Sequence, residues 1–250
     1  MNDPSTIAED ALLGGRVRLL QGKDGYRAAI DPVLLAAAVA AKSGEHVLDL
    51  GCGAGTAALC LAARVPGVNI TGLDIQKPLL DLARQNAALN NQQDDMVFLE
   101  GDLLHPPGEI AENSFDHVMV NPPYQGSSTG NPPPDPGKAI ANVEGAARLT
   151  DWVGAAAQAV RRKGSVTFIH RADRLDELLA AFHGLLGEVV VFPLWPEQGK
   201  AAKRVIVSAR KGVAAPARIS PGLVLHENDG YFSPVADAVL KDGTPLPLRE

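Results

Sequence analysis

Three glycines at alternate positions, Gly51, Gly53 and Gly55, form the first group of residues whose types and spacing could do chemistry. They directly follow the apolar run Val47–Leu50, in the string VLDLGCGAGT. A glycine turn between a buried strand and a helix lets the main chain approach a ligand closely. The turn departs from the dinucleotide pattern GxGxxG, because position 56 holds threonine in place of the third glycine. Taken alone, it fits a tight turn as well as a ligand site.

Three acidic residues, Asp49, Asp74 and Asp102, stand at the ends of three successive predicted strands and strengthen the case for a ligand. A negative charge just before the glycines would repel a pyrophosphate and favour an ammonium or sulfonium group. Asp74 ends the second strand, the usual place for a carboxylate that binds ribose hydroxyls. Asp102 follows the third strand and could approach an adenine amino group. The spacing therefore predicts a site for a positively charged nucleoside cofactor.

The second group is the string Asn-Pro-Pro-Tyr at 121–124, directly after the apolar run at Phe115–Val120. The side-chain carbonyl of Asn121 and the main-chain carbonyl of Pro122 can each accept one N–H of an exocyclic amine, which turns the nitrogen lone pair towards an electrophile. The two prolines hold these acceptors in place, so little reorganisation is needed. Tyr124 can stack on a base flipped out of its strand. A rigid turn is the alternative interpretation, but beside a nucleoside site the string predicts methyl transfer to a nitrogen.

Strands and helices alternate through the middle of the chain, which predicts an α/β fold with a mainly parallel sheet covered by helices on both faces. We expect seven strands, the last of them paired antiparallel. The predicted strands are 47–50, 68–74, 97–100, 115–120, 165–170, 189–195 and 204–209. The predicted helices that accompany them are 54–64, 78–90, 150–162 and 174–183.

We expect residues 1–250 to form a single domain, with an N-terminal cap at 1–45, a catalytic core at 46–211 and a C-terminal extension at 212–250. The cap holds a turn followed by an apolar helix. Residues 125–140 are so rich in Gly, Pro and Ser that they predict a loop. A long loop beside a catalytic site is typical of a mobile lid that faces the substrate.

Composition limits the class of protein. The net charge of −6 argues against a generally basic nucleic-acid binder, although local basic surfaces remain open. The two cysteines lack CxxC spacing, which predicts free thiols and no metal site. The longest apolar run is too short to span a membrane, and the N-terminus has no secretory pattern. We therefore expect a cytoplasmic enzyme without membrane contact.

Together the motifs resemble the class I S-adenosylmethionine-dependent methyltransferases of the amino-methylating Asn-Pro-Pro-Tyr type, which have a Rossmann-like fold. The flanking sequence is similar to the bacterial tRNA1(Val) (adenine-37-N6)-methyltransferase family, over nearly the whole chain after residue 14. Four strings carry this closer resemblance, at Gln21–Val39, Ile169–Leu179, Arg204–Gly212 and Leu223–Leu240.

The resemblance implies S-adenosyl-L-methionine as the cofactor and an adenine N6 in tRNA as the methyl acceptor. It implies catalytic roles for Asn121, Pro122 and Tyr124. It also implies cofactor contacts that include Asn121 itself. The expected cofactor-binding residues are Tyr26, Asp31, Asp49, Gly51, Gly53, Gly55, Asp74, Ile75, Asp102, Leu103 and Asn121.

Several alternatives stay open on the sequence. The same string serves enzymes that methylate a glutamine amide in release factors or guanine N2 in ribosomal RNA. A nicotinamide-dependent oxidoreductase would use a similar sheet, but the threonine at position 56 weighs against it. An inactive RNA-binding relative is a further alternative. For RNA, we expect a binding face around the rim of the site, made by Lys138, Arg148, Arg171 and the segment Lys200 to Arg204.

Overall fold

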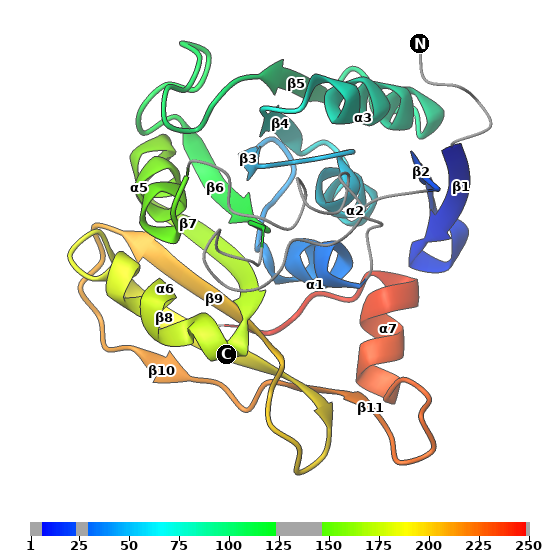
Figure 1. Cartoon of the computed structure of the whole chain (residues 1–250), viewed down its shortest axis with the longest axis vertical. Coiled ribbons are helices and arrows are strands. Elements are labelled where there is room, and N and C mark those ends of the chain that lie inside the picture. The colour runs from blue at the N-terminus through cyan, green and yellow to red at the C-terminus, as the bar shows by residue number, and fades with distance from the viewer. Residues whose placement is uncertain (1–6, 24–29, 124–146, 249–250) are drawn as a thin grey trace, which may run out of the picture.

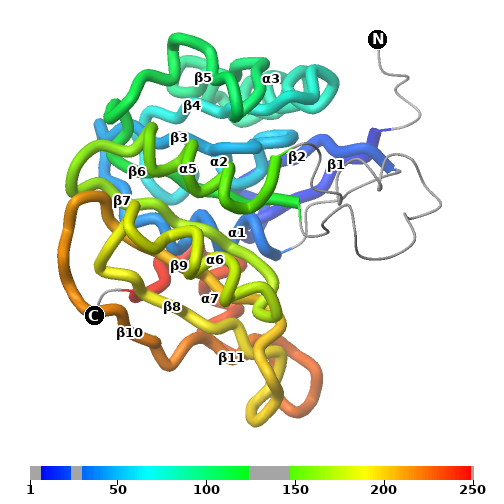
Figure 2. The backbone as a smooth tube through the Cα atoms, turned by 60° about the vertical axis from the view of Figure 1, so that its left-hand side comes forward, coloured from blue at the N-terminus to red at the C-terminus, as the bar shows by residue number. Residues whose placement is uncertain are grey.

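A nine-stranded sheet forms the centre of the molecule in the computed structural model, which describes residues 7–23, 30–123 and 147–248. The strand order is β5-β4-β3-β6-β7-β9-β8-β10, and β11 also pairs with β8, as Figure 2 shows from top to bottom. Strands β3 to β7 are mutually parallel, whereas β9 runs antiparallel to both of its neighbours. The seven main strands are β3 (His46–Leu50), β4 (Asn69–Asp74), β5 (Met96–Glu100), β6 (Phe115–Val120), β7 (Val160–Arg171), β8 (Leu186–Glu197) and β9 (Arg204–Lys211).

This arrangement confirms the predicted Rossmann-like sheet and extends it. The seven expected strands are present, with the last of them, β9, antiparallel as predicted. Two short strands, β10 (Arg218–Ile219) and β11 (Leu223–His226), pair in parallel with the outer edge of β8. Both come from the tail after Lys211, so part of the C-terminal extension continues the sheet.

Helices cover both faces of the sheet and divide its apolar side chains into two clusters (Figure 1). On one face, α1 and α2 pack together beside α3, and the C-terminal helix α7 packs against α1. On the other face, α5 and α6 pack together. The bounds of these helices are α1 (Asp31–Ala38), α2 (Thr56–Arg64), α3 (Lys77–Leu89), α5 (Leu149–Ala159), α6 (Leu175–Phe182) and α7 (Pro234–Asp242).

Helix α5 ends three residues earlier than the predicted helix at 150–162. Val160 has an extended backbone and is the first residue of β7. The side-chain ammonium of Lys211 donates to the main-chain carbonyls of Gln158 and Val160, at 3.3 and 3.1 Å. Because these carbonyls lie at the end of the helix, a cation from a distant strand satisfies groups that a longer helix would have used.

An N-terminal hairpin was not predicted. Strands β1 (Ile7–Leu12) and β2 (Val17–Gly22) pair antiparallel and form a separate two-stranded sheet. The hairpin packs against α3, as Figure 1 shows for the blue strands beside the teal helix. The predicted N-terminal cap therefore contains this hairpin followed by the apolar helix α1.

Candidate functional site

The glycine turn and the predicted acids meet where the parallel strands end. The sheet register pairs Leu50 of β3 with Leu73 of β4 on one side and with Val120 of β6 on the other. The residues that follow these three strands are therefore neighbours. We call this region, formed by the residues after β3, β4, β5, β6 and β7, the carboxyl edge of the sheet. Open parallel sheets bind their ligands at this edge.

The glycine turn needs glycine for two different physical reasons. Gly51, Gly53 and Gly55 have positive φ angles of 77°, 53° and 80°, a region that other L-residues rarely adopt. A Cβ on Gly51 would lie 2.7 Å from the ring of Trp152, so packing also excludes a side chain there. A Cβ on Gly53 would meet nothing within 4 Å. The turn is therefore packed at Gly51 and open at Gly53, where a ligand could approach the main chain.

Asp74 connects the turn to the end of β4. Its Oδ2 accepts the main-chain N–H of Gly53 at 2.8 Å, and its Oδ1 accepts that of Gln76 at 2.8 Å. Burial raises the pKa of Asp74, while these N–H donors oppose the shift. A carboxylate has about four acceptor positions, so lone pairs remain for ribose hydroxyls. The geometry thus fixes the carboxylate and leaves it able to bind a ligand.

Asp49 is almost completely buried, with 2% of its surface exposed. Its Oδ2 has no hydrogen-bond partner among the described residues. Burial raises the pKa of Asp49 to about 7, the charge of Asp74 adds to the rise, and the Ala58 N–H opposes it. An orphaned buried carboxylate oxygen is costly unless a donor or cation reaches it. The site therefore suits a ligand that carries a positive charge.

Ile75 and Asp102 frame the outer part of the carboxyl edge. Ile75, directly after Asp74, is 66% exposed although its side chain is apolar. Such a surface can cover one face of an adenine ring. The side chain of Asp102 is 39% exposed, and its Oδ1 accepts the Leu104 N–H at 2.9 Å. Its carboxylate can therefore still accept a hydrogen from an amino group.

Asn121 and Pro122 directly follow β6, as the sequence predicted. Val120 is paired with Leu50 on one side and with Phe168 of β7 on the other, so Asn121 lies next to the glycine turn in the sheet. Asn121 is half-buried and Pro122 is buried. This position beside the turn is what methyl transfer from a bound cofactor to an amine would require.

Of two further predicted cofactor residues, Asp31 and Tyr26, only Asp31 is among the described residues. Asp31, at the start of α1, accepts the Nε–H of Arg204 at 3.0 Å, so this carboxylate has a structural partner at the first residue of β9. Tyr26 and Tyr124 lie outside the described residues, as do Lys138 and the Pro-rich segment at 125–140. Their roles stay predictions.

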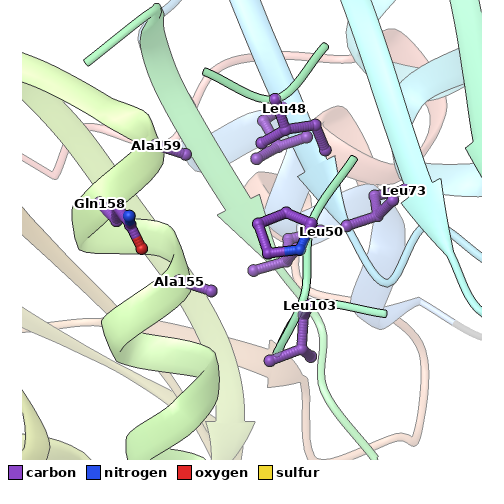
Figure 3. A pocket seen from close by; sticks show the side chains of 9 residues that line it. Leu48, Leu50, Leu73, Leu103, Ala155, Gln158 and Ala159 are labelled. Carbon is purple, nitrogen blue, oxygen red and sulfur yellow. The ribbon is translucent and has the colours of Figure 1, made fainter. Parts of the chain in front are cut away.

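Leu103 lies in a different environment from the other predicted cofactor residues. Its side chain lines a small apolar cavity between the sheet and α5, which Figure 3 shows. Leu103 is also packed against the hydrophobic cluster on the α5 side of the sheet. A cofactor contact from Leu103 would therefore have to come from its main chain. The cavity is lined by Leu48, Leu50, Leu73, Leu103, Pro106, Ile110, Ala155, Gln158 and Ala159.

The basic residues expected at an RNA face lie among the described residues, apart from Lys138. Arg171 and Arg204 are paired in the β7–β9 register at the carboxyl edge. Arg171 forms an ion pair with Asp173. Lys200 and Lys203 are exposed at the carboxyl edge, and neither has an ion-pair partner within the described ranges. The predicted RNA face thus retains Lys200, Lys203 and Arg171 in one region. Arg148, also predicted there, pairs with Asp151 in the first turn of α5.

The sequence predicted neither a metal site nor a membrane-spanning segment, and the structure bears on both only within the residues that it describes. Within it, no group of three or more His, Cys, Asp or Glu side chains is placed to hold a metal ion. In the same ranges, every helix is too short or too polar to cross a bilayer.

Cys52 and Cys60 are buried free thiols, and burial raises the pKa of Cys60 to about 12. A neutral thiol of this kind is a poor nucleophile.

Comparison with known proteins identifies the family of the chain. Residues 29–170 match the family model of the methyltransferase small domain. A tRNA1(Val) (adenine(37)-N6)-methyltransferase from Porphyromonas gingivalis is 32% identical over 200 residues, which cover 76% of each chain. A release factor glutamine methyltransferase from Chlorobaculum tepidum is 34% identical over 92 residues, 36% of this chain and 31% of the relative. The crystal structure of a predicted O-methyltransferase from Agrobacterium tumefaciens superposes with a TM-score of 0.74 at 25% identity, covering 88% of this chain and 99% of that one.

The sheet, the glycine turn and the acids at the carboxyl edge define a class I S-adenosylmethionine-dependent methyltransferase. The orphaned Asp49 oxygen, the open side of Gly53 and the exposed Ile75 fit a cationic nucleoside cofactor. More specifically, the chain belongs to the methyltransferase small domain family and, within it, to the family of the tRNA1(Val) (adenine(37)-N6)-methyltransferases.

Proposed function

We propose that this methyltransferase transfers a methyl group to N6 of an adenine in tRNA. Two observations support the proposal. Asn121 and Pro122 follow β6 directly beside the glycine turn, where an amine would have to lie to meet the methyl donor. A relative that shares 32% of its residues over most of both chains is named for this reaction. The position of Asn121 is the observation that carries most of the argument.

Three residues of the carboxyl edge would each contact a different part of the cofactor. Asp74 would bind the ribose hydroxyls, Ile75 would cover the adenine ring, and Asp49 would face the positive charge of the cofactor. Bound S-adenosylmethionine supplies a sulfonium methyl group, which an amine nitrogen attacks directly as the carbon–sulfur bond breaks. No covalent enzyme intermediate is required.

Asn121 and Pro122 would position the target amine. The side-chain carbonyl of Asn121 and the main-chain carbonyl of Pro122 would each accept one N–H, which orients the lone pair towards the methyl group. The amine releases one proton when the new N–C bond has formed, and solvent can accept it. Tyr124 would hold the flipped base by stacking. Because the acceptors are fixed in advance, the gain comes from positioning.

A labelling experiment tests the proposal. Purified protein is incubated with tRNA and with S-adenosylmethionine that carries an isotopically labelled methyl group, and the nucleosides are separated by mass spectrometry. We expect the label in N6-methyladenosine, and at matched short incubation times far less label with Asn121→Ala. Parallel incubations with a release factor and with ribosomal RNA complete the test. Label in glutamine or in guanine N2, with none in adenine, would contradict the proposal.

A further inference from the structure

Two asparagines, Asn86 on α3 and Asn90 directly after its last residue, hold the N-terminal hairpin through their side-chain amides. Asn90 accepts the Arg18 N–H at 2.9 Å and donates to the Arg18 carbonyl at 2.7 Å. Asn86, one helical turn earlier, accepts the Leu20 N–H at 2.7 Å and donates to the Leu20 carbonyl at 3.0 Å. Arg18 and Leu20 are alternate residues of β2, so their main-chain groups face the same side. The two amides therefore bind the edge of β2 as a neighbouring strand would.

Asn90 uses its second N–H within the same segment, on the main-chain carbonyl of Asn86 at 2.8 Å, whereas Asn86 reaches a partner outside it. Its Nδ2 also donates to the carbonyl of Ala54 at 3.0 Å, and Ala54 lies between Gly53 and Gly55 in the glycine turn. The Asn86 side chain is fully buried. One carboxamide thus joins three parts of the molecule, which are the hairpin, α3 and the cofactor turn. Its acceptor and both of its N–H donors are used in these bonds.

The Ala54 carbonyl would be a costly group to leave without a donor, because it lies against the buried Asn86 side chain. Without Asn86, the Ala54 carbonyl would lose this donor, and the peptide after Ala54 would be free to turn towards another one. The same turn carries the N–H of Gly53, which must point at Asp74 to keep the ribose-binding carboxylate in place. A rotation at Ala54 would therefore disturb the cofactor site without removing any residue that touches the cofactor.

We propose that Asn86 is a positioning residue for S-adenosylmethionine binding, and that it couples the N-terminal hairpin to the cofactor site. The inference rests on the cofactor site alone and is independent of which molecule accepts the methyl group. Coupling of this kind is reciprocal. If Asn86 holds the turn in its binding conformation, cofactor binding must in turn stabilise the hairpin.

Matched substitutions at Asn86 and Asn90 test whether Asn86 positions the glycine turn for the cofactor or only stabilises the hairpin. Asn86→Asp keeps the size and the acceptor but removes both donors, and it faces the Ala54 and Leu20 carbonyls with a carboxylate. Asn90→Asp makes the same change one helical turn further on, where the contacts are to Arg18 and to the main-chain carbonyl of Asn86, and not to the glycine turn. We expect Asn86→Asp to weaken cofactor affinity about five- to twentyfold, the effect of losing one buried hydrogen bond to the turn. Asn90→Asp should change the affinity less than about twofold, because it leaves the turn intact.

Three measurements complete the test. Titration calorimetry gives the affinities, and kinetics should show a raised KM for the cofactor with kcat retained at saturation for Asn86→Asp. Hydrogen exchange should rise at residues 51–56 in Asn86→Asp only. If the Asn86→Asp protein does not fold, the same measurements are made on Asn86→Ala, which adds no charge. In the unmodified protein, saturating S-adenosylmethionine should slow exchange of the Arg18 and Leu20 amides. The proposal would be overturned if the two Asp variants changed cofactor affinity equally. It would also be overturned if saturating cofactor left the hydrogen exchange of the Arg18 and Leu20 amides unchanged.

Discussion

The main-chain N–H of Gly53 donates to Oδ2 of Asp74 at 2.8 Å, so the glycine turn after β3 is tied directly to the carboxylate at the end of β4. The sequence predicted both groups as ligand-binding residues, but it did not predict that they bind each other. This bond makes the site a preformed unit. A ligand that uses Asp74 also benefits from the turn that Asp74 holds in place.

Asp74→Ala should therefore weaken S-adenosylmethionine binding on two counts, through the missing ribose hydrogen bonds and through the loosened turn. Charge-assisted hydrogen bonds contribute about 1.5–3 kcal/mol, so we expect the dissociation constant to rise on the order of ten- to a hundredfold. Calorimetric titration measures this directly. Asp81→Ala on the exposed surface of α3 is the matched control, since it also removes a carboxylate but only breaks ion pairs with Lys77 and Arg84. Equal affinity of Asp74→Ala and the unmodified protein would refute the ribose assignment.

Cofactor binding should depend on pH through Asp49. Its pKa of about 7 means that the free protein holds this carboxyl protonated below neutral pH. A positively charged cofactor favours the ionised form. The dissociation constant should therefore rise as the pH falls below about 7, by up to about tenfold per pH unit, and level off above it. Titrations between pH 5.5 and pH 8 check the profile. Asp49→Asn has no proton to lose and should show no such step, and a flat profile in the unmodified protein would contradict the assignment.

The same group has an opposite effect on the stability of the free protein. The pKa of Asp49 lies above its ordinary value of 3.8, so the folded state binds the proton more tightly than the unfolded state does. This contribution to stability is present at low pH and is lost as the pH rises from about 4 to about 7. A higher unfolding free energy for Asp49→Asn than for the unmodified protein at pH 8, with a smaller difference at pH 5, is the expected outcome in denaturant titrations.

The body of the fold could be predicted because its signals are local. The parallel strands are short apolar runs that stop at turn residues, and β6 was predicted at its observed bounds, Phe115–Val120. The glycine turn, Asp49 and Asp74 stand at strand ends that the alternation of strands and helices already fixes. Leu103 shows the limit of this reasoning, because a position after a strand does not reveal which way a side chain points.

Other features depend on partners that are distant in the sequence. The carbonyls around the end of α5 bind donors that are distant in the sequence: Lys211, about fifty residues further on, binds those of Gln158 and Val160, and the N–H of Ser114 binds that of Ala159. The N-terminal hairpin depends on Asn86 and Asn90, whose role is visible only when α3 and β2 are side by side. Their spacing of four residues, across the last turn of α3 and its C-cap, was the available signal. Helix α7 was missed although Ser233 caps its start and Gly243 ends it.

Leu103→Ala should lower stability more than it changes cofactor binding. The side chain lines the cavity beneath α5, so its removal enlarges a space that is already incompletely filled. Large-to-small changes of this kind cost about 2–5 kcal/mol at fully buried sites, and we expect the lower part of that range because Leu103 is only partly buried. Thermal unfolding and calorimetric titration measure the two effects. Leu104→Ala, at an exposed neighbour, serves as the control. A large loss of affinity at unchanged stability would place the Leu103 side chain in the cofactor site.

RNA binding should depend on salt through the basic residues of the carboxyl edge. Each phosphate that a cation neutralises on a single strand contributes about 0.7 to the log–log slope of affinity against salt. Reversing the charge of Arg171 and Lys203 to glutamate should flatten that slope by about 0.7 for each phosphate that is no longer neutralised, and leave cofactor affinity unchanged. Arg162 and Lys163, exposed at the other end of β7, provide the matched control pair for charge reversal. An equal flattening with the control pair would show that the RNA face lies elsewhere.

Asn121→Ala tests the chemical step itself. If the Asn121 carbonyl accepts a hydrogen from the target amine, its contribution is largest as the nitrogen becomes tetrahedral, so the substitution should reduce mainly kcat. Loss of one preorganised group of this kind typically costs on the order of 10²–10³ in rate. Single-turnover methylation of tRNA measures the rate, and calorimetry should show that cofactor affinity changes far less than the rate, because Asp74 and the glycine turn remain. Tyr124→Phe is the companion variant and should retain activity, since stacking needs the ring and not the hydroxyl. Normal turnover by Asn121→Ala would reduce the Asn-Pro-Pro-Tyr string to a rigid turn after β6.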